Sequence, residues 1–374
     1  MNAAEKKEFV EKMRSLLLAA RFPELPEVPE TGKWYRTQLE GCVNARGGSH
    51  YVSLKIGTEK KLVVLFQGGG VSWDPFTAAR PLNLDNLYDE DRVAFYFDDA
   101  DPGTDITVDS GIGCGAEENP FRNWSVISIN YSTGDLHVGR NDYPYTSVDG
   151  RDAVLHHHGY RNYHASLDTA MKYIPQPEKL LIIGGSGGGF GVAALSDEVI
   201  QRFQDCKDVT CCVDSALLVR DWKPTAVDIW KAPEEICQNL CSNNYTLDCL
   251  KALHGKYGSS IKYLFTCAPR DGELARFQSF MDGYGAIFSK ESGDRFQNYL
   301  REMVAELQSE IPEMGLFFFD KFLFEGTDPD DVLMQHTIIQ NPNVFEKIKD
   351  GKSVMDWLWN AVNGKIEKIG LDVL

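Results

Sequence analysis

Six short apolar runs alternate with stretches of helical periodicity along this chain, and the alternation limits the folds open to it. Several of the runs are continuously apolar, as strands buried on both faces of a mostly parallel sheet are. The runs are KLVVLFQ at 61–67, WSVISIN at 124–130, KLLIIGG at 179–185, VTCCV at 209–213, IKYLFTC at 261–267 and GLFFF at 315–319.

The stretches between these runs carry the apolar stripes of helices that pack on a sheet. In the clearest one, side chains recur at spacings of three and four, at Tyr160, Tyr163, Leu167, Met171 and Ile174. The stretch 192–203 repeats the pattern. Strands that alternate with such helices predict a three-layer α/β domain with a mostly parallel central sheet.

The chain divides into a short N-terminal piece and one large domain. Residues 2–20 have the pattern of a charged helix, and three prolines in PELPEVPETG at 23–32 end it. We therefore expect a helix and linker over 1–32 and a single domain over 33–374. The segment at about 221–258 interrupts the strand and helix rhythm and predicts a helical cap insertion.

The charge balance excludes some classes of partner. There are 38 lysines and arginines against 55 acidic residues, a net charge of −17, which repels nucleic acids and anionic membranes. The N-terminal apolar run of about five residues is too short for a signal-peptide core. No stretch approaches the roughly 20 apolar residues of a membrane span. We expect a cytoplasmic protein with no nucleic acid or membrane partner; the sequence does not indicate its oligomeric state.

Nine cysteines in 374 residues do not resemble a disulfide scaffold, and most are expected to be buried thiols. The group Cys237, Cys241 and Cys249 leaves a structural disulfide open. Zinc is less favoured there because no paired CxxC spacing is present.

One serine stands among glycines between an apolar run and an amphipathic stretch. Gly184-Gly-Ser-Gly-Gly188 matches the strand, turn and helix of a nucleophile elbow, in which Ser186 is the nucleophile. A dinucleotide loop fails because Phe190 or Val192 stands where its last glycine is needed, and a phosphate loop fails because no lysine follows. A plain glycine-rich turn, whose serine only caps the helix, is the alternative.

Backbone amides near Ser186 are candidates for an oxyanion hole, which binds the negative oxygen of a tetrahedral intermediate. The Gly187 amide lies at the start of the expected helix, where the helix dipole is positive. A second donor is expected from the triple glycine that ends in Gly69 and Gly70, directly after the run at 61–67. An ordinary tight turn is the alternative for this triple glycine.

In α/β hydrolases the catalytic residues follow the order serine, acid, histidine. After Ser186 the sequence has two histidines, His254 inside the expected insertion and His336 after the last run, and we favour His336 as the base. The favoured acid is Asp271, in the turn after IKYLFTC, where a carboxylate can orient the imidazole. The rival acids are Asp214, Asp320 and Asp331.

The run His156-His157-His158 raises the question of a metal site. Consecutive side chains point in different directions on a helix or a strand, so the three rings cannot share one tetrahedral ion. We therefore predict no metal site and read the run as the entry to a helix.

Several segments together resemble the pectinacetylesterase family, which includes the Notum-like carboxylesterases of the α/β-hydrolase superfamily. They lie in family order between about 60 and 345. The segments are 65–74 (LFQGGGVSWD), 119–124 (NPFRNW), 130–139 (NYSTGDLHVG), 157–162 (HHGYRN), 184–191 (GGSGGGFG) and 336–339 (HTII).

This resemblance implies an α/β-hydrolase fold and hydrolysis of an O-linked acyl ester. It also implies a triad of Ser186, Asp271 and His336, with an oxyanion hole from the Gly69 and Gly70 loop and Gly187. Ser72 and Ser132 stand where secreted members of the family carry cysteine, which fits a reducing compartment and argues against extracellular pectin as the substrate.

The sequence therefore predicts a serine carboxylesterase that removes an O-acyl group, expected to be acetyl, from a carbohydrate or small molecule without a cofactor or metal. Trp73 and Phe190 are candidates for the acyl pocket, and Asp135 or His137 for a contact to an alcohol-side hydroxyl. The alternatives are a catalytically silent binding protein on the hydrolase fold and a lipase or peptidase on the same scaffold.

Overall fold

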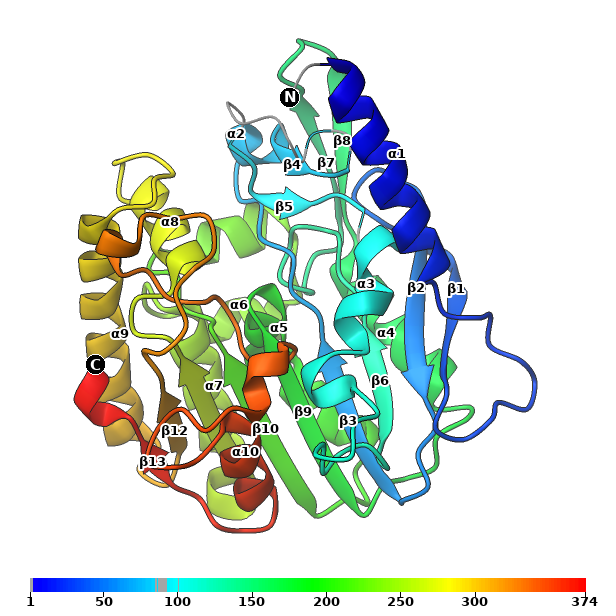
Figure 1. Cartoon of the computed structure of the whole chain (residues 1–374), viewed down its shortest axis with the longest axis vertical. Coiled ribbons are helices and arrows are strands. Elements are labelled where there is room, and N and C mark those ends of the chain that lie inside the picture. Colours follow the sequence, from blue (N-terminus) through cyan, green and yellow to red (C-terminus); the bar gives the residue numbers. More distant parts are fainter. Residues whose placement is uncertain (1–2, 85, 87–92, 100) are drawn as a thin grey trace.

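The computed structural model describes residues 3–84, 86, 93–99 and 101–374. Within these residues the main element is a nine-stranded sheet (Figure 1). Its strands are β1 (Trp34–Val43), β2 (Ser49–Lys55), β3 (Lys61–Phe66), β6 (Ser125–Ile129), β9 (Lys179–Gly185), β10 (Asp208–Asp214), β11 (Lys262–Cys267), β12 (Gly315–Phe318) and β13 (Lys368–Ile369). The six predicted runs are all strands of this sheet.

The strand order across the sheet is β1-β2-β6-β3-β9-β10-β11-β12-β13. From β6 to β13 neighbouring strands are parallel, whereas β2 runs antiparallel to both β1 and β6. The parallel part aligns the carboxyl ends of β3, β9, β10 and β11 at one edge. Ligand sites of open α/β sheets lie at this edge.

Two small sheets accompany the main one. Strands β4 (Pro81–Leu82) and β5 (Tyr96–Phe97) pair in parallel, and β7 (Asn141–Thr146) and β8 (Asp152–His157) form an antiparallel hairpin. The hairpin was not among the predicted elements. Its strand β7 alternates half-buried and exposed residues and contains Pro144, so it lacks the continuous apolar run of a buried strand.

Helices cover both faces of the sheet (Figure 1). The described helices are α1 (Ala3–Ala19), α2 (Pro75–Ala78), α3 (Asp101–Val108), α4 (Gly159–Ala170), α5 (Gly187–Arg202), α6 (Glu234–Asn239), α7 (Tyr245–Tyr257), α8 (Gly272–Met281), α9 (Lys290–Glu310) and α10 (Val354–Val362). The predicted helix stripes correspond to α4 and α5. The interrupting segment 221–258 contains α6 and α7, and α7 packs on α5.

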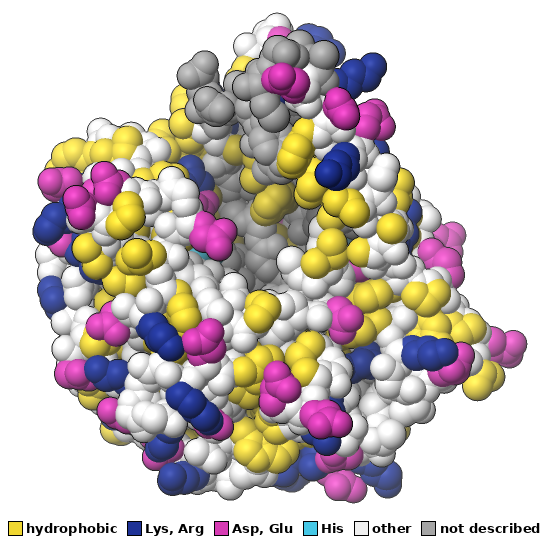
Figure 2. Space-filling view, viewed as in Figure 1, with side chains coloured by type: hydrophobic (Ala, Val, Ile, Leu, Met, Phe, Trp, Pro, Cys, Tyr) yellow, Lys and Arg dark blue, Asp and Glu magenta, His cyan; other side chains and the backbone are white. Residues whose placement is uncertain are grey.

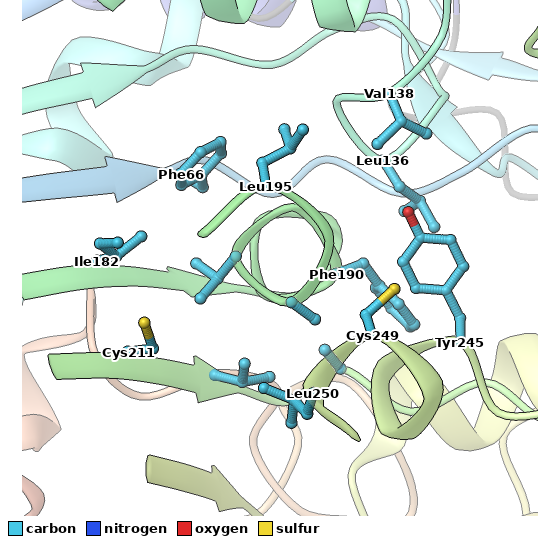
Figure 3. Packing of buried hydrophobic residues seen from close by; sticks show 14 of the residues in the cluster. Phe66, Leu136, Val138, Ile182, Phe190, Leu195, Cys211, Tyr245, Cys249 and Leu250 are labelled. Carbon is cyan, nitrogen blue, oxygen red and sulfur yellow. The ribbon is translucent and has the colours of Figure 1, made fainter. Parts of the chain in front are cut away.

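The core lies in two layers, one on each face of the sheet. Along β3, Val64 and Phe66 belong to the cluster under α4, α5, α7 and α9, whereas Val63 and Leu65 belong to the cluster under α10. This alternation follows from the period of two along a strand. Figure 3 shows α5 surrounded by such side chains, with Phe66 and Ile182 on the sheet side and Leu250 on α7. The predicted α/β fold with three layers is confirmed.

Helix α1 lies against α3, beside the edge of the sheet that β1 and β2 form (Figure 1). Residue 2, the predicted first residue of this helix, lies outside the described residues. No helix in the described part of the chain has the length and apolar character needed to cross a membrane.

All nine cysteines lie in the described residues, and each is a free thiol. Cys237 and Cys249 are buried and Cys241 is exposed. The disulfide left open for this group is therefore not formed in the structure.

Candidate active site

Ser186 occupies a sharp turn between β9 and α5. Its backbone has φ 55° and ψ −129°, a conformation that costs a non-glycine residue free energy and that clusters at functional sites. The turn closes tightly, because a Cβ on Gly184 would lie 2.6 Å from the carbonyl oxygen of Gly188. The structure therefore has the strand, turn and helix of the nucleophile elbow that the glycine pattern predicts.

The triple glycine after β3 lies directly against this turn. A Cβ on Gly68 would lie 2.9 Å from the Cβ of Ser186, and one on Gly187 would lie 3.6 Å from the Gly69 amide nitrogen. Gly70 has φ 77°, and a Cβ there would lie 2.1 Å from the carbonyl oxygen of Phe95. Only glycine fits the approach of this loop to Ser186.

The amides around Ser186 come from both glycine segments. Gly187 is the first residue of α5, and the amides of a first helical turn have no acceptor within the helix. The hydroxyl of Tyr131 donates to the carbonyl oxygen of Gly70 at 3.0 Å and accepts from the amide of Leu136 at 2.9 Å. Tyr131 thereby fixes the orientation of the loop; it stands in segment 130–139, but no role was predicted for it.

His336 and Asp271 form a buried pair. The Nδ1 atom of His336 lies 2.8 Å from Oδ2 and 2.9 Å from Oδ1 of Asp271, whose side chain is fully buried. Asp271 is also the N-cap of α8, where it accepts a hydrogen bond from the amide of Leu274 at 3.0 Å. The carboxylate is therefore held from two sides and fixes the position of the ring.

The pKa of His336 reflects two opposing effects. Burial by itself lowers the pKa, but the adjacent Asp271 carboxylate, through its charge and its hydrogen bond, more than offsets this, and the net shift is upward. The Asp271 carboxylate thus stabilises the imidazolium form of His336. A general base needs this stabilisation, because it holds a proton during the reaction.

Asp214, a rival candidate for the acid, bonds to backbone amides and not to the ring of His336. It ends β10, is fully buried, and accepts hydrogen bonds from the amides of Ile338 at 2.7 Å and Ile339 at 3.0 Å. Burial raises its pKa to about 6, although these amides act in the opposite direction. Asp214 therefore anchors the backbone directly after His336.

In the described part of the chain, neither of the other rival acids bonds to His336. Asp331 accepts from the backbone amide of Lys290, and Asp320 is exposed. His254, the second candidate base, pairs with Glu313 at 2.8 Å. Among the four candidate acids of the described chain, Asp271 is the one whose carboxylate bonds to His336.

Ser186 and His336 line one cavity of about 510 Å³. No hydrogen bond joins their side chains among the described residues, a common state of such pairs before a substrate binds. Figure 2 shows this face of the molecule hollowed between α8 and α3, with hydrophobic side chains along the hollow. The cavity is also lined by glycines 68–70 and Gly187, and by apolar side chains that include Leu136, Phe190, Leu218, Leu274, Phe277 and Phe324.

The cavity wall contains one of the four predicted substrate contacts, Phe190. Trp73 is buried among aromatic rings, with Phe95 at 5.3 Å and Trp222 at 6.3 Å between centroids. Asp135 and His137 are likewise buried and are not among the residues that line the cavity. The structure therefore does not bring these three side chains to the site.

Asp135 and His137 instead support the glycine loop at 68–70 from behind. Burial lowers the pKa of His137 to about 4, so its ring is neutral, and its Nε2 lies 2.8 Å from the carbonyl oxygen of Gln67. Asp135 accepts from the amides of His137 and Gly159. Gln67 is the residue before the triple glycine, and the sequence offered no signal that these side chains meet it.

Comparisons with known proteins give one matching family and a similar solved structure. The family described as Pectinacetylesterase matches residues 100–253. A solved structure of the Wnt deacylase Notum from Drosophila aligns with a TM-score of 0.58 at 17% identity, covering 89% of this chain and 95% of that chain. No curated protein sequence matches the chain.

The Notum structure shows the fold, and the family match covers the segment that includes Ser186 and the turn at Asp135. The predicted resemblance is therefore confirmed: residues 100–253 match the pectinacetylesterase family, and the chain has an α/β-hydrolase-like fold, which together support a carboxylic ester hydrolase.

Proposed function

We propose that the protein hydrolyses an acyl ester by a serine, histidine and aspartate mechanism. The observation that carries the proposal is that the strained Ser186 and the His336–Asp271 pair meet at one cavity. In the first step His336 takes the proton of the Ser186 hydroxyl while its oxygen attacks the ester carbonyl. Asp271 holds the ring in the tautomer that leaves Nε2 free to accept this proton.

The tetrahedral intermediate carries a negative oxygen, which the amides of Gly69, Gly70 and Gly187 stabilise. The imidazolium of His336 then protonates the leaving alcohol, and an acyl group stays on Ser186. In the second half of the reaction, water attacks this acyl-enzyme with His336 again as the base, and the free carboxylic acid leaves. The steps consume one water and require no cofactor.

The acyl group that fits best is larger than acetyl. A cavity of about 510 Å³ lies within the roughly 300–1,000 Å³ typical of sites for drug-sized ligands. An acetyl group would leave most of this apolar space to water, whereas each buried methylene contributes about 0.8 kcal/mol. The cavity therefore supports an apolar acyl chain over the acetyl group that the sequence predicts.

A second cavity of about 200 Å³ adjoins the first and offers room for the alcohol part of the ester. The two share Gln67, Gly68, Phe97 and Thr107. That this alcohol is a carbohydrate or a small molecule, as the sequence predicts, stays a prediction. The predicted cytoplasmic location also stays a prediction.

The test uses p-nitrophenyl acetate, butyrate and octanoate with the wild-type protein and Ser186→Ala. We expect Ser186→Ala to lower kcat by a factor on the order of 10⁴–10⁶. From acetate to butyrate kcat/KM should rise about 15-fold, since two methylenes of about 0.8 kcal/mol each become buried. Equal rates of the two proteins refute the mechanism, and a preference for acetate refutes the larger acyl group alone.

A fluorophosphonate probe separates the proposal from a silent binding protein on the same fold. Labelling requires an activated serine, so we expect label on the wild type and none on Ser186→Ala. Hydrolysis of a p-nitroanilide as fast as of the matching ester would instead favour a peptidase.

A further inference from the structure

The histidine run at 156–158 forms a cluster that the function above does not use. It lies where β8 ends and α4 begins. His157 points inward: it is fully buried, and its Nδ1 lies 2.8 Å from the carbonyl oxygen of Thr133. His156 and His158 lie on the other side, as residues two apart on an extended chain do. The three adjacent rings therefore cannot share one ion, as expected. The two outer rings, His156 and His158, lie on the same side and can.

A carboxylate from the neighbouring strand meets these two rings. Asp142 of β7 is the direct partner of His156 in the antiparallel hairpin, so the two side chains project from facing positions. Its Oδ1 lies 2.7 Å from Nδ1 of His156 and 2.8 Å from Nε2 of His158. Two imidazole nitrogens and one carboxylate oxygen thus lie within 4.8 Å of one another.

We propose that Asp142, His156 and His158 bind a divalent transition-metal ion, of which Zn²⁺ is the best match. Zinc takes imidazole nitrogen and carboxylate oxygen at about 2.0–2.2 Å, which places tetrahedral ligand atoms about 3.4 Å apart. The carboxylate has to move by about 0.6 Å from each ring nitrogen to admit the ion. Each ring then carries its proton on the nitrogen that faces away from the metal, and solvent completes the coordination.

The site is both held in place and open to solvent. The amide of His156 donates to the carbonyl oxygen of Ala45 at 3.1 Å, and Asp135 holds the first amide of α4 directly after His158. The side chains of Asp142, His156 and His158 are 61%, 27% and 20% exposed, so an ion can reach them. A bound ion would link the β7–β8 hairpin to the start of α4.

The ligand set also predicts which ions bind. Two imidazoles favour Zn²⁺, Ni²⁺ and Cu²⁺ over Mg²⁺ and Ca²⁺, which prefer oxygen ligands.

The test is calorimetric titration of the full chain with ZnCl₂ after treatment with a chelator. We expect the wild type to bind one more ion per chain than His156→Ala or Asp142→Asn. Asp142 is exposed, so Asp142→Asn should stay folded. The control is His254→Ala, which removes a similarly exposed histidine that faces the single carboxylate of Glu313 and should leave the stoichiometry unchanged.

Nitrogen-15 spectra of the imidazoles give an independent readout. Zinc should shift Nδ1 of His156 and Nε2 of His158, the two atoms that face Asp142, and leave His254 unchanged. The proposal is overturned if wild type and Asp142→Asn bind the same number of ions, or if zinc shifts neither ring. Both measurements are independent of esterase activity, so failure of the proposed function would not affect them.

Discussion

Replacing Asp271 with asparagine removes the charge of this side chain and keeps its shape. Asparagine caps a helix as well as aspartate does, so the hydrogen bond to the Leu274 amide and the start of α8 are retained. The new amide group, however, donates to Nδ1 of His336. The ring proton then moves to Nε2, and no lone pair is left to accept the proton of Ser186.

The size of the effect follows from the distance in the buried pair. During the reaction a positive imidazolium lies 2.8 Å from the Asp271 carboxylate. With an effective dielectric constant of about 20, their attraction is about 6 kcal/mol, which corresponds to roughly 10⁴-fold in rate. We therefore expect Asp271→Asn to lower kcat by about 10⁴ and to leave KM and the unfolding temperature nearly unchanged.

The assay is hydrolysis of p-nitrophenyl butyrate, with circular dichroism to confirm folding. The matched control is Asp214→Asn, which changes a buried carboxylate at the end of the neighbouring strand that bonds backbone amides and not the ring. It should stay at least about 100-fold more active than Asp271→Asn, because it retains the tautomer of His336. A folded Asp271→Asn protein within tenfold of the wild type would refute this assignment of the acid.

Two further predictions concern the base and the oxyanion loop. Because the pKa of His336 is raised and only the neutral ring accepts a proton, kcat/KM should fall toward acid with its half-maximum above pH 6.5; a half-maximum below that value in a pH–rate profile contradicts the pair. Gly70→Ala should destabilise the fold by about 1–3 kcal/mol and reduce activity, because its φ is 77° and its Cβ would meet Phe95. Gly115→Ala, at an exposed glycine with open space, is the control in denaturant unfolding, and equal stability of the two variants would contradict the argument.

The sequence alone determined six of the nine strands of the sheet and the sharp turn that holds Ser186. Continuous apolar runs are strands because such runs are stable only when both faces are covered, and the glycines around Ser186 permit one kind of turn between a strand and a helix. These are local constraints, and they need no knowledge of distant parts of the chain. The order of serine, acid and histidine then reduced the candidates for the base to two histidines.

The tertiary structure decided which side chains meet. Asp271 and Asp214 both follow buried strands, and only the path of the loop through residues 320–336 places His336, 65 positions later, against Asp271. Packing also turned Asp135 and His137 inward beneath the glycine loop at 68–70 and left a cavity of about 510 Å³ beside Ser186.

The histidine run at 156–158 shows the same difference between what the sequence determines and what the tertiary structure decides. His156 and His158 lie on the same side because side chains alternate along an extended chain. Asp142 joins them only through the register of the β7–β8 hairpin, which no apolar run in the sequence predicts. Periodicity along a chain fixes what each segment becomes, whereas contacts between segments depend on how loops and registers bring them together, and the chemistry of this protein lies in those contacts.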